Sequence, residues 1–219
     1  MLDLHCHILP GVDDGAQDMR DSQLMLMAAK AAGIDSIVCT PHVREPYFHG
    51  AEEFEAMWQA FYALEDEAAG MGIALSMGFE VSHRKLTELG LAWAEALHTD
   101  ESADLLLELS VGASPERFAV YERTIFELQG MGYDVIIAHP ERYIAIQEDI
   151  GIAEELVRMG CRLQLSADFL EGGRFGREKK PAIALLEAGL VSFIASDAHW
   201  PAHYKLFAQA HDLYGGLLV

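Results

Sequence analysis

The chain has 219 residues, 51% of them hydrophobic, and a formal net charge of −20 at pH 7. A chain of this length and composition can bury one sizeable core, and we expect a single domain over residues 1–219. The acidic balance excludes a nucleic-acid groove, which needs clustered Lys and Arg to neutralise phosphates. No apolar run approaches the roughly 18 residues of a membrane span, and no signal-peptide pattern opens the chain. We therefore expect a cytoplasmic protein without membrane insertion.

Apolar runs alternate along the chain with segments of helical spacing. The runs predict strands buried on both faces, as in a parallel sheet, over residues 2–6, 36–39, 73–79, 104–109, 133–138, 161–167 and 191–195. The segments between them predict helices over residues 19–32, 52–70, 84–97, 115–130, 144–159 and 178–189. Several of these helices end at glycine, and the order of helix, glycine and strand repeats about every 30 residues. This pattern predicts a seven-stranded parallel (β/α) barrel, with an open doubly wound sheet as the alternative.

Two histidines stand at the end of the first predicted strand. Residues i and i+2 of a strand point to the same face, so His5 and His7 project together while Cys6 projects the other way. Two imidazoles on one face at a strand end form half of a metal site. A pair of exposed or hydrogen-bonded histidines is the simpler interpretation of this motif taken alone.

Residues of metal-binding types also follow the other predicted strands, except the strand at 161–167. In a parallel barrel the functional groups gather at the carboxyl ends of the strands. Each residue alone also has a structural interpretation: Glu108 as a salt-bridged core residue, His42 as a turn residue, Asp197 as a helix cap. The candidates in chain order are His5, His7, Asp14, His42, Glu80, Glu108, His139, Asp197 and His199.

One pocket that gathers these imidazoles and carboxylates would be electrostatically untenable without cations. The sequence therefore predicts a site that holds more than one metal ion. Mixed imidazole and carboxylate ligands suit Mn, Zn or Fe, whereas Ca²⁺ favours a cage of oxygens.

These residues, in this order, resemble the PHP (polymerase and histidinol phosphatase) superfamily. The segments HCHILPGVDDG at 5–15 and HPERY at 139–143 resemble one branch of it, the manganese-dependent bacterial protein-tyrosine phosphatases of capsule and exopolysaccharide clusters. The resemblance runs from residue 2 to about residue 200. It implies an α/β fold, a distorted seven-stranded (β/α)7 TIM-like barrel of the PHP type. It also implies two or three divalent metal ions, with Mn first and Fe or Zn as alternatives.

The resemblance further implies which residues act in the site. One ion would be held by His5, His7, Glu80 and Asp197, a second by Glu80, Glu108 and His139, and a third by Asp14, His42 and His199. Catalytic roles would fall to Arg142, His42, His199 and Asp197, and phosphate contacts to Arg142, Arg44, His203 and Lys205.

In such a site a metal-bridging hydroxide would attack the phosphorus of a phosphate ester. The resemblance implies a phosphotyrosine protein as substrate, with a bacterial tyrosine kinase of polysaccharide export as the expected partner. One alternative is a phosphatase of small molecules such as histidinol phosphate or a sugar phosphate. Another is a non-catalytic scaffold, against which the full set of ligand residues weighs. The oligomeric state is left open.

The cysteines argue against covalent cysteine catalysis. A cysteine-dependent tyrosine phosphatase needs a thiolate and an Arg at a fixed later position, with backbone amides between them. Cys39 lies one residue too close to Arg44, and Cys6 and Cys161 have no such Arg. Their odd number and apolar surroundings are typical of reduced, buried thiols.

One feature departs from the pattern of the branch. Its members carry a further Arg after the Asp-x-His motif, whereas the segment from Trp200 to Lys205 contains none. His203 or Lys205 would then have to contact the phosphate.

Overall fold

The computed structural model describes residues 1–100 and 102–219, and its paired strands are all parallel. The strands are β1 (Leu2–Cys6), β2 (Ser36–Cys39), β3 (His42–Val43), β4 (Ala74–Met77), β5 (Glu80–Ser82), β6 (Asp104–Glu108), β7 (Asp134–Ala138), β8 (Arg162–Ser166) and β9 (Phe193–Ala195). They form one sheet of order β1-β2-β4 and a second of order β3-β5-β6-β7-β8-β9.

Helices connect these strands. The α-helices are α1 (Met19–Ala31), α2 (Ala51–Gly70), α3 (His83–Leu89), α4 (Ala94–Leu97), α5 (Phe118–Gly130), α6 (Ile144–Glu148), α7 (Gly151–Arg158), α8 (Lys179–Glu187) and α9 (His203–Tyr214). Short 3₁₀ segments are η1 (Leu91–Trp93), η2 (Pro115–Arg117), η3 (Pro140–Arg142), η4 (Ala167–Glu171) and η5 (Gly215–Leu217).

The parallel α/β architecture is confirmed, but the strand count is corrected. The described residues hold nine strands, whereas the sequence predicted seven. Each predicted strand coincides with one observed strand, and β3 and β5 are the short additions that follow β2 and β4. Pro41 has no N–H to donate to a ladder, so β2 stops before it. After this break β3 pairs with β5 in the second sheet, with His42 beside Glu80.

The predicted helices differ from the observed ones mainly in continuity. The helix predicted over 84–97 is divided into α3, η1 and α4, and the one over 144–159 into α6 and α7. The first break lies at Gly90, whose φ of 95° is incompatible with a continuing helix. α9 lies outside the ranges predicted as helices.

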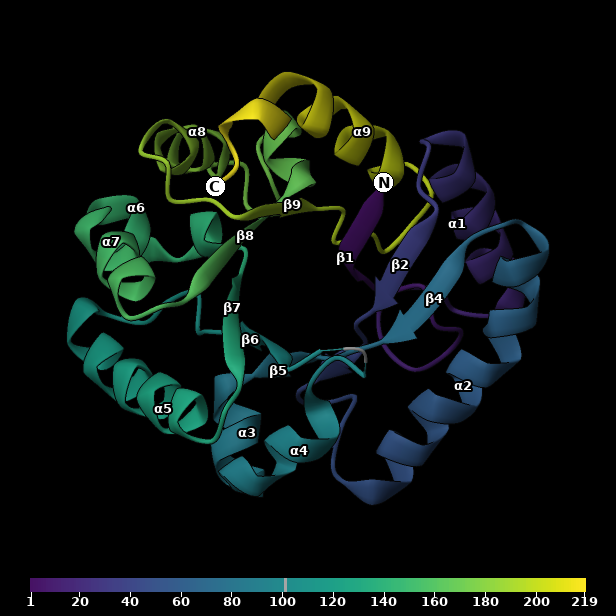
Figure 1. Cartoon of the computed structure of the whole chain (residues 1–219), viewed down its shortest axis with the longest axis horizontal. Helices are drawn as coiled ribbons and strands as arrows, with labels where there is room; N and C mark the ends of the chain where they lie inside the picture. Colours follow the sequence, from purple (N-terminus) through teal and green to yellow (C-terminus); the bar gives the residue numbers. More distant parts are fainter. Residues whose placement is uncertain (101) are drawn as a thin grey trace.

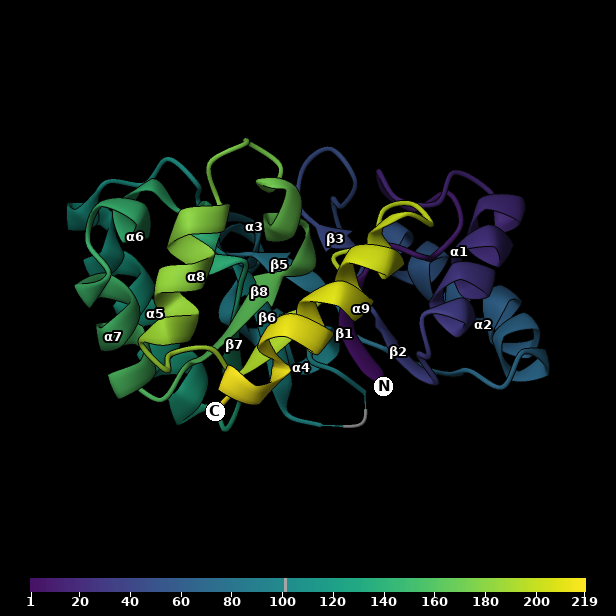
Figure 2. The ribbon, with the colours of Figure 1, turned by 90° about the horizontal axis from the view of Figure 1, so that it is seen from above.

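Figure 1 shows the strands around the centre of the molecule and the helices outside them. Successive strand residues point to opposite faces, so β6 contributes to two apolar clusters. Leu105 and Leu107 are fully buried in the main core, which also contains Ile125 of α5. Leu106 lies in a small second cluster with Ile136. Both termini lie on the side at which β1 begins, as Figure 2 shows, so the carboxyl ends of the strands point away from them.

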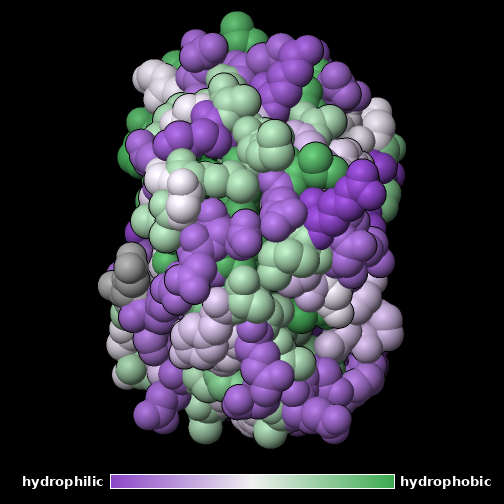
Figure 3. Space-filling model, turned by 90° about the vertical axis from the view of Figure 1, so that its right-hand side faces the viewer, coloured by the Kyte–Doolittle hydropathy of each residue, from purple (hydrophilic) through white to green (hydrophobic). Residues whose placement is uncertain are grey.

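Three observations bear on surface, membrane and cysteines. Figure 3 shows the face over α1 and α2, where hydrophilic side chains are spread throughout with apolar ones between them. None of the helices in the described part of the chain is long and apolar enough to cross a membrane. Cys6, Cys39 and Cys161 are free and buried, as the sequence predicted.

Tyr143 ties the ends of β6 and β7 together. Its hydroxyl donates to the carbonyl oxygen of Ala138 at 2.6 Å and accepts from the N–H of Leu109 at 2.9 Å. The side chain is fully buried, so water cannot replace either hydrogen bond.

We expect Tyr143→Phe to lower the free energy of unfolding by about 1–3 kcal/mol, because the buried N–H of Leu109 loses its acceptor. Urea denaturation measures this change. Tyr62→Phe on α2 is the matched control, since that ring is 61% exposed and its loss of a hydroxyl should change little. Equal stability of the two variants would contradict the role given to Tyr143.

Candidate metal centre

The carboxyl ends of the strands bring all the predicted ligand residues together. Backbone hydrogen bonds first join the end of β1 to the segment after β9: His7 N donates to Ala198 O and Asp197 N donates to His5 O, each at 2.8 Å. Four other candidates open, end or directly follow neighbouring strands of the second sheet. They are His42 in β3, Glu80 in β5, Glu108 in β6 and His139 directly after β7.

The first group consists of His5, His7 and Glu80, with Asp197 beside the two histidines. His5 Nε2 and His7 Nε2 are 3.2 Å apart. Glu80 Oε2 lies 3.5 Å from both nitrogens, and Asp197 Oδ1 lies 3.4 Å and 3.3 Å from them. Tetrahedral ligands about 2.0–2.1 Å from a metal ion are about 3.3–3.4 Å from one another. The ligand atoms of His5, His7 and Glu80 all lie within 4.8 Å of one another, and Asp197 lies beside both histidines, so these side chains fit a divalent ion.

The outer nitrogens of the two histidines are held by acceptors. His5 Nδ1 lies 2.8 Å from Gln164 Oε1, and His7 Nδ1 lies 2.8 Å from Asp13 Oδ2. An amide oxygen and a carboxylate can only accept, so each Nδ1 carries the proton in a neutral ring and each Nε2 presents a lone pair. Two lone pairs that face each other at 3.2 Å need a cation between them. The tautomers thus agree with a metal site.

The carboxylates around His5 demand positive charge. Burial lowers the pKa of His5, but the charges of Glu80 and Asp197 outweigh it and raise that pKa to about 10. A proton or a metal ion can supply the charge that these buried carboxylates require.

Glu80 reaches two sets of imidazoles. Its Oε1 lies 2.7 Å from His139 Nε2, and its Oε2 lies 2.6 Å from His42 Nδ1. Glu108 completes a group with His42 and Glu80 whose ligand atoms all lie within 4.8 Å of one another. Burial, followed by the Glu80 charge, raises the pKa of Glu108 to about 7. Burial and the neighbouring Arg142 lower the pKa of His139 to about 4, which leaves that imidazole neutral.

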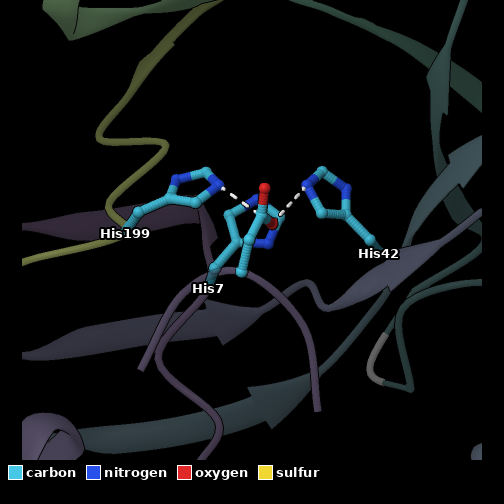
Figure 4. Close-up of side chains that lie close together, drawn as sticks. His7, His42 and His199 are labelled. Carbon is cyan, nitrogen blue, oxygen red and sulfur yellow. Dashed lines mark ion pairs between the residues drawn. The ribbon is translucent and has the colours of Figure 1, made fainter. Parts of the chain in front are cut away.

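A further group lies beside the first. The ligand atoms of His7, Asp14, His42 and His199 all lie within 4.8 Å of one another. In Figure 4 the rings of His42 and His199 point inward from opposite sides, with His7 between them. Asp14 Oδ1 is 3.1 Å from His42 Nε2 and 3.5 Å from His199 Nε2.

Several buried atoms of these groups lack hydrogen bonds. Asp14 Oδ1, His42 Nδ1, Glu80 Oε2 and His199 Nε2 are buried without a hydrogen-bond partner, although they lie close to one another. Buried polar atoms are normally satisfied, and unpaired atoms that converge on one region point to a missing ion. These unpaired atoms are a second observation that the donor set fits divalent metal ions.

The backbone is strained where two of the candidates stand. In the described residues, His139 (φ 36°) and Asp197 (φ 47°) are the non-glycine residues with positive φ. Each such conformation costs on the order of 1–3 kcal/mol and persists where the surroundings impose it. At Gly15, an added Cβ would lie 2.0 Å from the carbonyl oxygen of His7, so only glycine lets the loop with Asp13 and Asp14 approach this closely.

Arg142 is buried beside the first group. One guanidinium nitrogen, Nη2, donates to Asp197 Oδ2 at 2.6 Å, to Ser166 Oγ at 3.0 Å and to Asp168 Oδ2 at 3.1 Å. Burial lowers the pKa of Arg142, but the charges of Asp197 and Asp168 outweigh it and raise that pKa above its usual value. The guanidinium is therefore fixed in position and always charged.

Two cavities adjoin the centre. The first, of about 870 Å³, is lined by Asp14, Arg142, Asp197, His199, His203 and Lys205 among others. The second, of about 750 Å³, is lined by Arg44 and Glu108 among others. The predicted phosphate contacts therefore lie in two places. Arg142, His203 and Lys205 face the first cavity, whereas Arg44 lines the second and donates to His42 Nε2 at 2.8 Å.

The supporting residues Asp13, Gln164, Ser166 and Asp168 were not predicted from the sequence. The last three lie in β8, which is the predicted strand without a ligand type, and in η4 directly after it. Gln164 and Ser166 are polar residues that alternate with Leu163 and Leu165 in β8, and both are fully buried. That alternation was the signal that could have revealed them.

Comparison with known proteins identifies relatives along nearly the whole chain. Residues 1–205 match the family described as "Capsular polysaccharide synthesis, CpsB/CapC". The tyrosine-protein phosphatase YwqE of Bacillus subtilis is 36% identical over 202 residues, which are 91% of this chain and 77% of the relative. The tyrosine-protein phosphatase CpsB of Streptococcus pneumoniae is 30% identical over 97% of this chain and 89% of its own.

Solved structures agree with this relationship. A chain from the crystal structures of YwqE from Bacillus subtilis and CpsB from Streptococcus pneumoniae, described as metal-dependent tyrosine phosphatases, superposes with a TM-score of 0.79. The two chains are 31% identical, and the matched region covers 99% of this chain and 89% of the related chain. The hisK protein of Listeria monocytogenes, a candidate histidinol phosphatase, has a TM-score of 0.59 at 12% identity and shows the fold alone. The chain therefore belongs to the CpsB/CapC family of capsular polysaccharide synthesis.

Proposed function

We propose that this protein is a metal-dependent phosphatase that hydrolyses phosphotyrosine on proteins and thereby regulates capsular polysaccharide synthesis. The observation that carries the proposal is the convergence on His5 and His7, whose Nε2 atoms lie 3.2 Å apart and 3.3–3.5 Å from one carboxylate oxygen of Glu80 and one of Asp197. Support comes from relatives at 30–36% identity that are named tyrosine-protein phosphatases.

We propose manganese as the metal, with iron or zinc as alternatives, since imidazoles and carboxylates are mixed in the donor set. The proposed ligands are the nine predicted residues. Bound ions would polarise the phosphoryl group and activate the attacking water. Glu80 would act between two ions, because its two oxygens face different imidazoles. Asp13 and Gln164 would keep the outer nitrogens of His7 and His5 protonated. The nine residues are His5, His7, Asp14, His42, Glu80, Glu108, His139, Asp197 and His199.

The cavity of about 870 Å³ is the proposed place of the substrate. Arg142 supplies a fixed positive charge there, and His203 and Lys205 line the same cavity. Trp200, 55% exposed, offers an aromatic face beside which a phosphotyrosine ring can lie. The phenol leaving group has a pKa of about 10, so it departs with less help from a general acid than an alcohol needs.

A bacterial tyrosine kinase of polysaccharide export is the proposed protein substrate, on the basis of the family to which the chain belongs. A cytoplasmic location and a single domain over residues 1–219 stay predictions. The free, buried cysteines are typical of a reducing compartment and support the predicted cytoplasmic location.

We further propose that the two sheets together are one distorted (β/α)7 barrel of the PHP type. Two pairs of short strands, β2 with β3 and β4 with β5, would each count as one interrupted barrel strand. The bridge between Cys6 and Ala198 supports contact between the first and last strands. The fold shared with the hisK protein supports the same interpretation.

The function is tested by hydrolysis of a phosphotyrosyl peptide after chelation and resupply of Mn²⁺. We expect loss of turnover on chelation, recovery with Mn²⁺, and slower turnover of histidinol phosphate by the same protein. Faster turnover of histidinol phosphate would favour the small-molecule phosphatase. No turnover of either substrate by protein with bound Mn²⁺ would contradict the proposal and favour the scaffold.

Glu80→Gln tests the proposed bridging carboxylate, because it keeps the size of the side chain and removes its charge. We expect fewer bound metal ions per chain and a loss of activity beyond the roughly 10- to 100-fold typical of outer-shell changes. Metal analysis after gel filtration and peptide hydrolysis measure the two effects. Glu88→Gln on α3 is the matched control, since that carboxylate pairs with Arg84 and Lys85 outside the centre. Full activity of Glu80→Gln at limiting metal would refute the bridging role.

Asp13→Asn tests the support of His7, because an amide holds the Nδ1 proton less strongly than a carboxylate does. We expect metal affinity to fall roughly 10- to 100-fold. Equilibrium dialysis against Mn²⁺ measures the affinity. Asp66→Asn on α2, at an exposed position, is the control. Unchanged affinity in Asp13→Asn would show that His7 needs no such partner.

A further inference from the structure

We propose that Arg174 binds the phosphoryl group of the substrate, as a specificity residue for phosphate monoesters. The inference rests on the proposed phosphatase function. Arg174 lies in the segment between η4 and α8 and lines the cavity of about 870 Å³.

The segment that carries Arg174 is built to a fixed shape. Gly173 has φ 74°, and an added Cβ there would lie 2.6 Å from Glu178 Oε2. The side chain of Glu178 is fully buried and accepts from the N–H of Phe175 at 3.0 Å and of Arg177 at 2.9 Å. A buried carboxylate that accepts two backbone N–H groups orders the segment around it. The backbone that carries Arg174 is therefore held in one conformation.

The guanidinium of Arg174 reaches the metal-binding groups. Its Nη2 lies 3.9 Å from Asp14 Oδ2, and Nη2 of Arg44 lies 3.6 Å from the same oxygen. The other oxygen of Asp14 faces His42 and His199. Two guanidinium groups therefore lie within 4 Å of one carboxylate oxygen at the edge of the centre.

Arg174 has capacity to bind an anion. A guanidinium has five N–H donors in a planar fork, and a single contact at 3.9 Å leaves most of them available. The side chain is 50% exposed, so its donors can be reached from the cavity. Arg142 differs, since its Nη2 is shared among Asp197, Ser166 and Asp168. The available N–H donors of Arg174 could then bind the outer oxygens of a phosphoryl group that lies next to His199.

Arg174→Ala and Arg174→Lys test this assignment, with Arg177→Ala as the matched control. Arg177 lies in the same segment, but its guanidinium packs over the Phe175 ring at 5.9 Å and does not line the cavity. Two quantities are measured on Mn²⁺-loaded protein: the Kd of inorganic phosphate by equilibrium dialysis, and KM and kcat for phenyl phosphate. Phenyl phosphate has no polypeptide, so it isolates contacts to the phosphoryl group. Bound metal is quantified in each variant.

We expect Arg174→Ala to raise the Kd of phosphate and the KM of phenyl phosphate roughly 10- to 100-fold at unchanged metal content. Arg174→Lys should recover part of the loss, because it keeps the charge and lacks the fork. Arg177→Ala should stay within about twofold of the unchanged protein.

Two outcomes would overturn the inference. One is equal phosphate affinity of Arg174→Ala and Arg177→Ala. The other is a loss confined to phosphotyrosyl peptides, which would make Arg174 a contact to the polypeptide. If the unchanged protein hydrolyses no phosphate ester, the proposed function fails, whereas the dialysis still decides whether Arg174 binds phosphate.

Discussion

The fold of this protein depends on a concentration of buried charge around Glu80. This carboxylate is almost completely buried, and its oxygens lie 2.6 Å and 2.7 Å from the imidazoles of His42 and His139. The lone pairs of His5 and His7 face the same region. Such a cluster is unfavourable in a low-dielectric interior unless cations offset it. The residues that surround it are therefore arranged by electrostatics as much as by apolar packing.

Hydrogen bonds around the cluster link elements far apart in the sequence. Gln164 of β8 holds His5 of β1, and Arg142 of η3 holds Asp197 after β9. Asp3, buried in β1, accepts from the N–H and the hydroxyl of Ser196 at 2.8 Å and 2.5 Å. These contacts hold the strand ends at which His139 and Asp197 adopt costly backbone conformations. The site and the contacts between strand ends thus support each other.

The sequence allowed the ligand residues to be placed because they lie at or after the ends of strands, and strands can be recognised from local apolar runs. The ends of these runs, at or just before His5, His42 and His139, can be recognised without knowledge of tertiary contacts. Gln164 escaped prediction since its role depends on the position of β8 relative to β1, which no local pattern reports. The broken ladders at β3 and β5 escaped for the same reason. Arg174 stands in a glycine-rich segment without periodicity, so only the folded backbone shows what it faces.

The charge of the chain sets a final constraint on substrate binding. A protein with a formal net charge of −20 repels a phosphate dianion at long range, although salt screens exposed charges beyond roughly 8–10 Å. Attraction must therefore act at contact distance, where Arg142, Arg174 and Lys205 line one cavity beside the metal-binding groups. In the proposed function, recognition would centre on the phosphoryl group rather than on the charge of the polypeptide that carries it, because these cations act over a few ångströms. A strongly acidic surface and a phosphate-binding site are then compatible in one molecule.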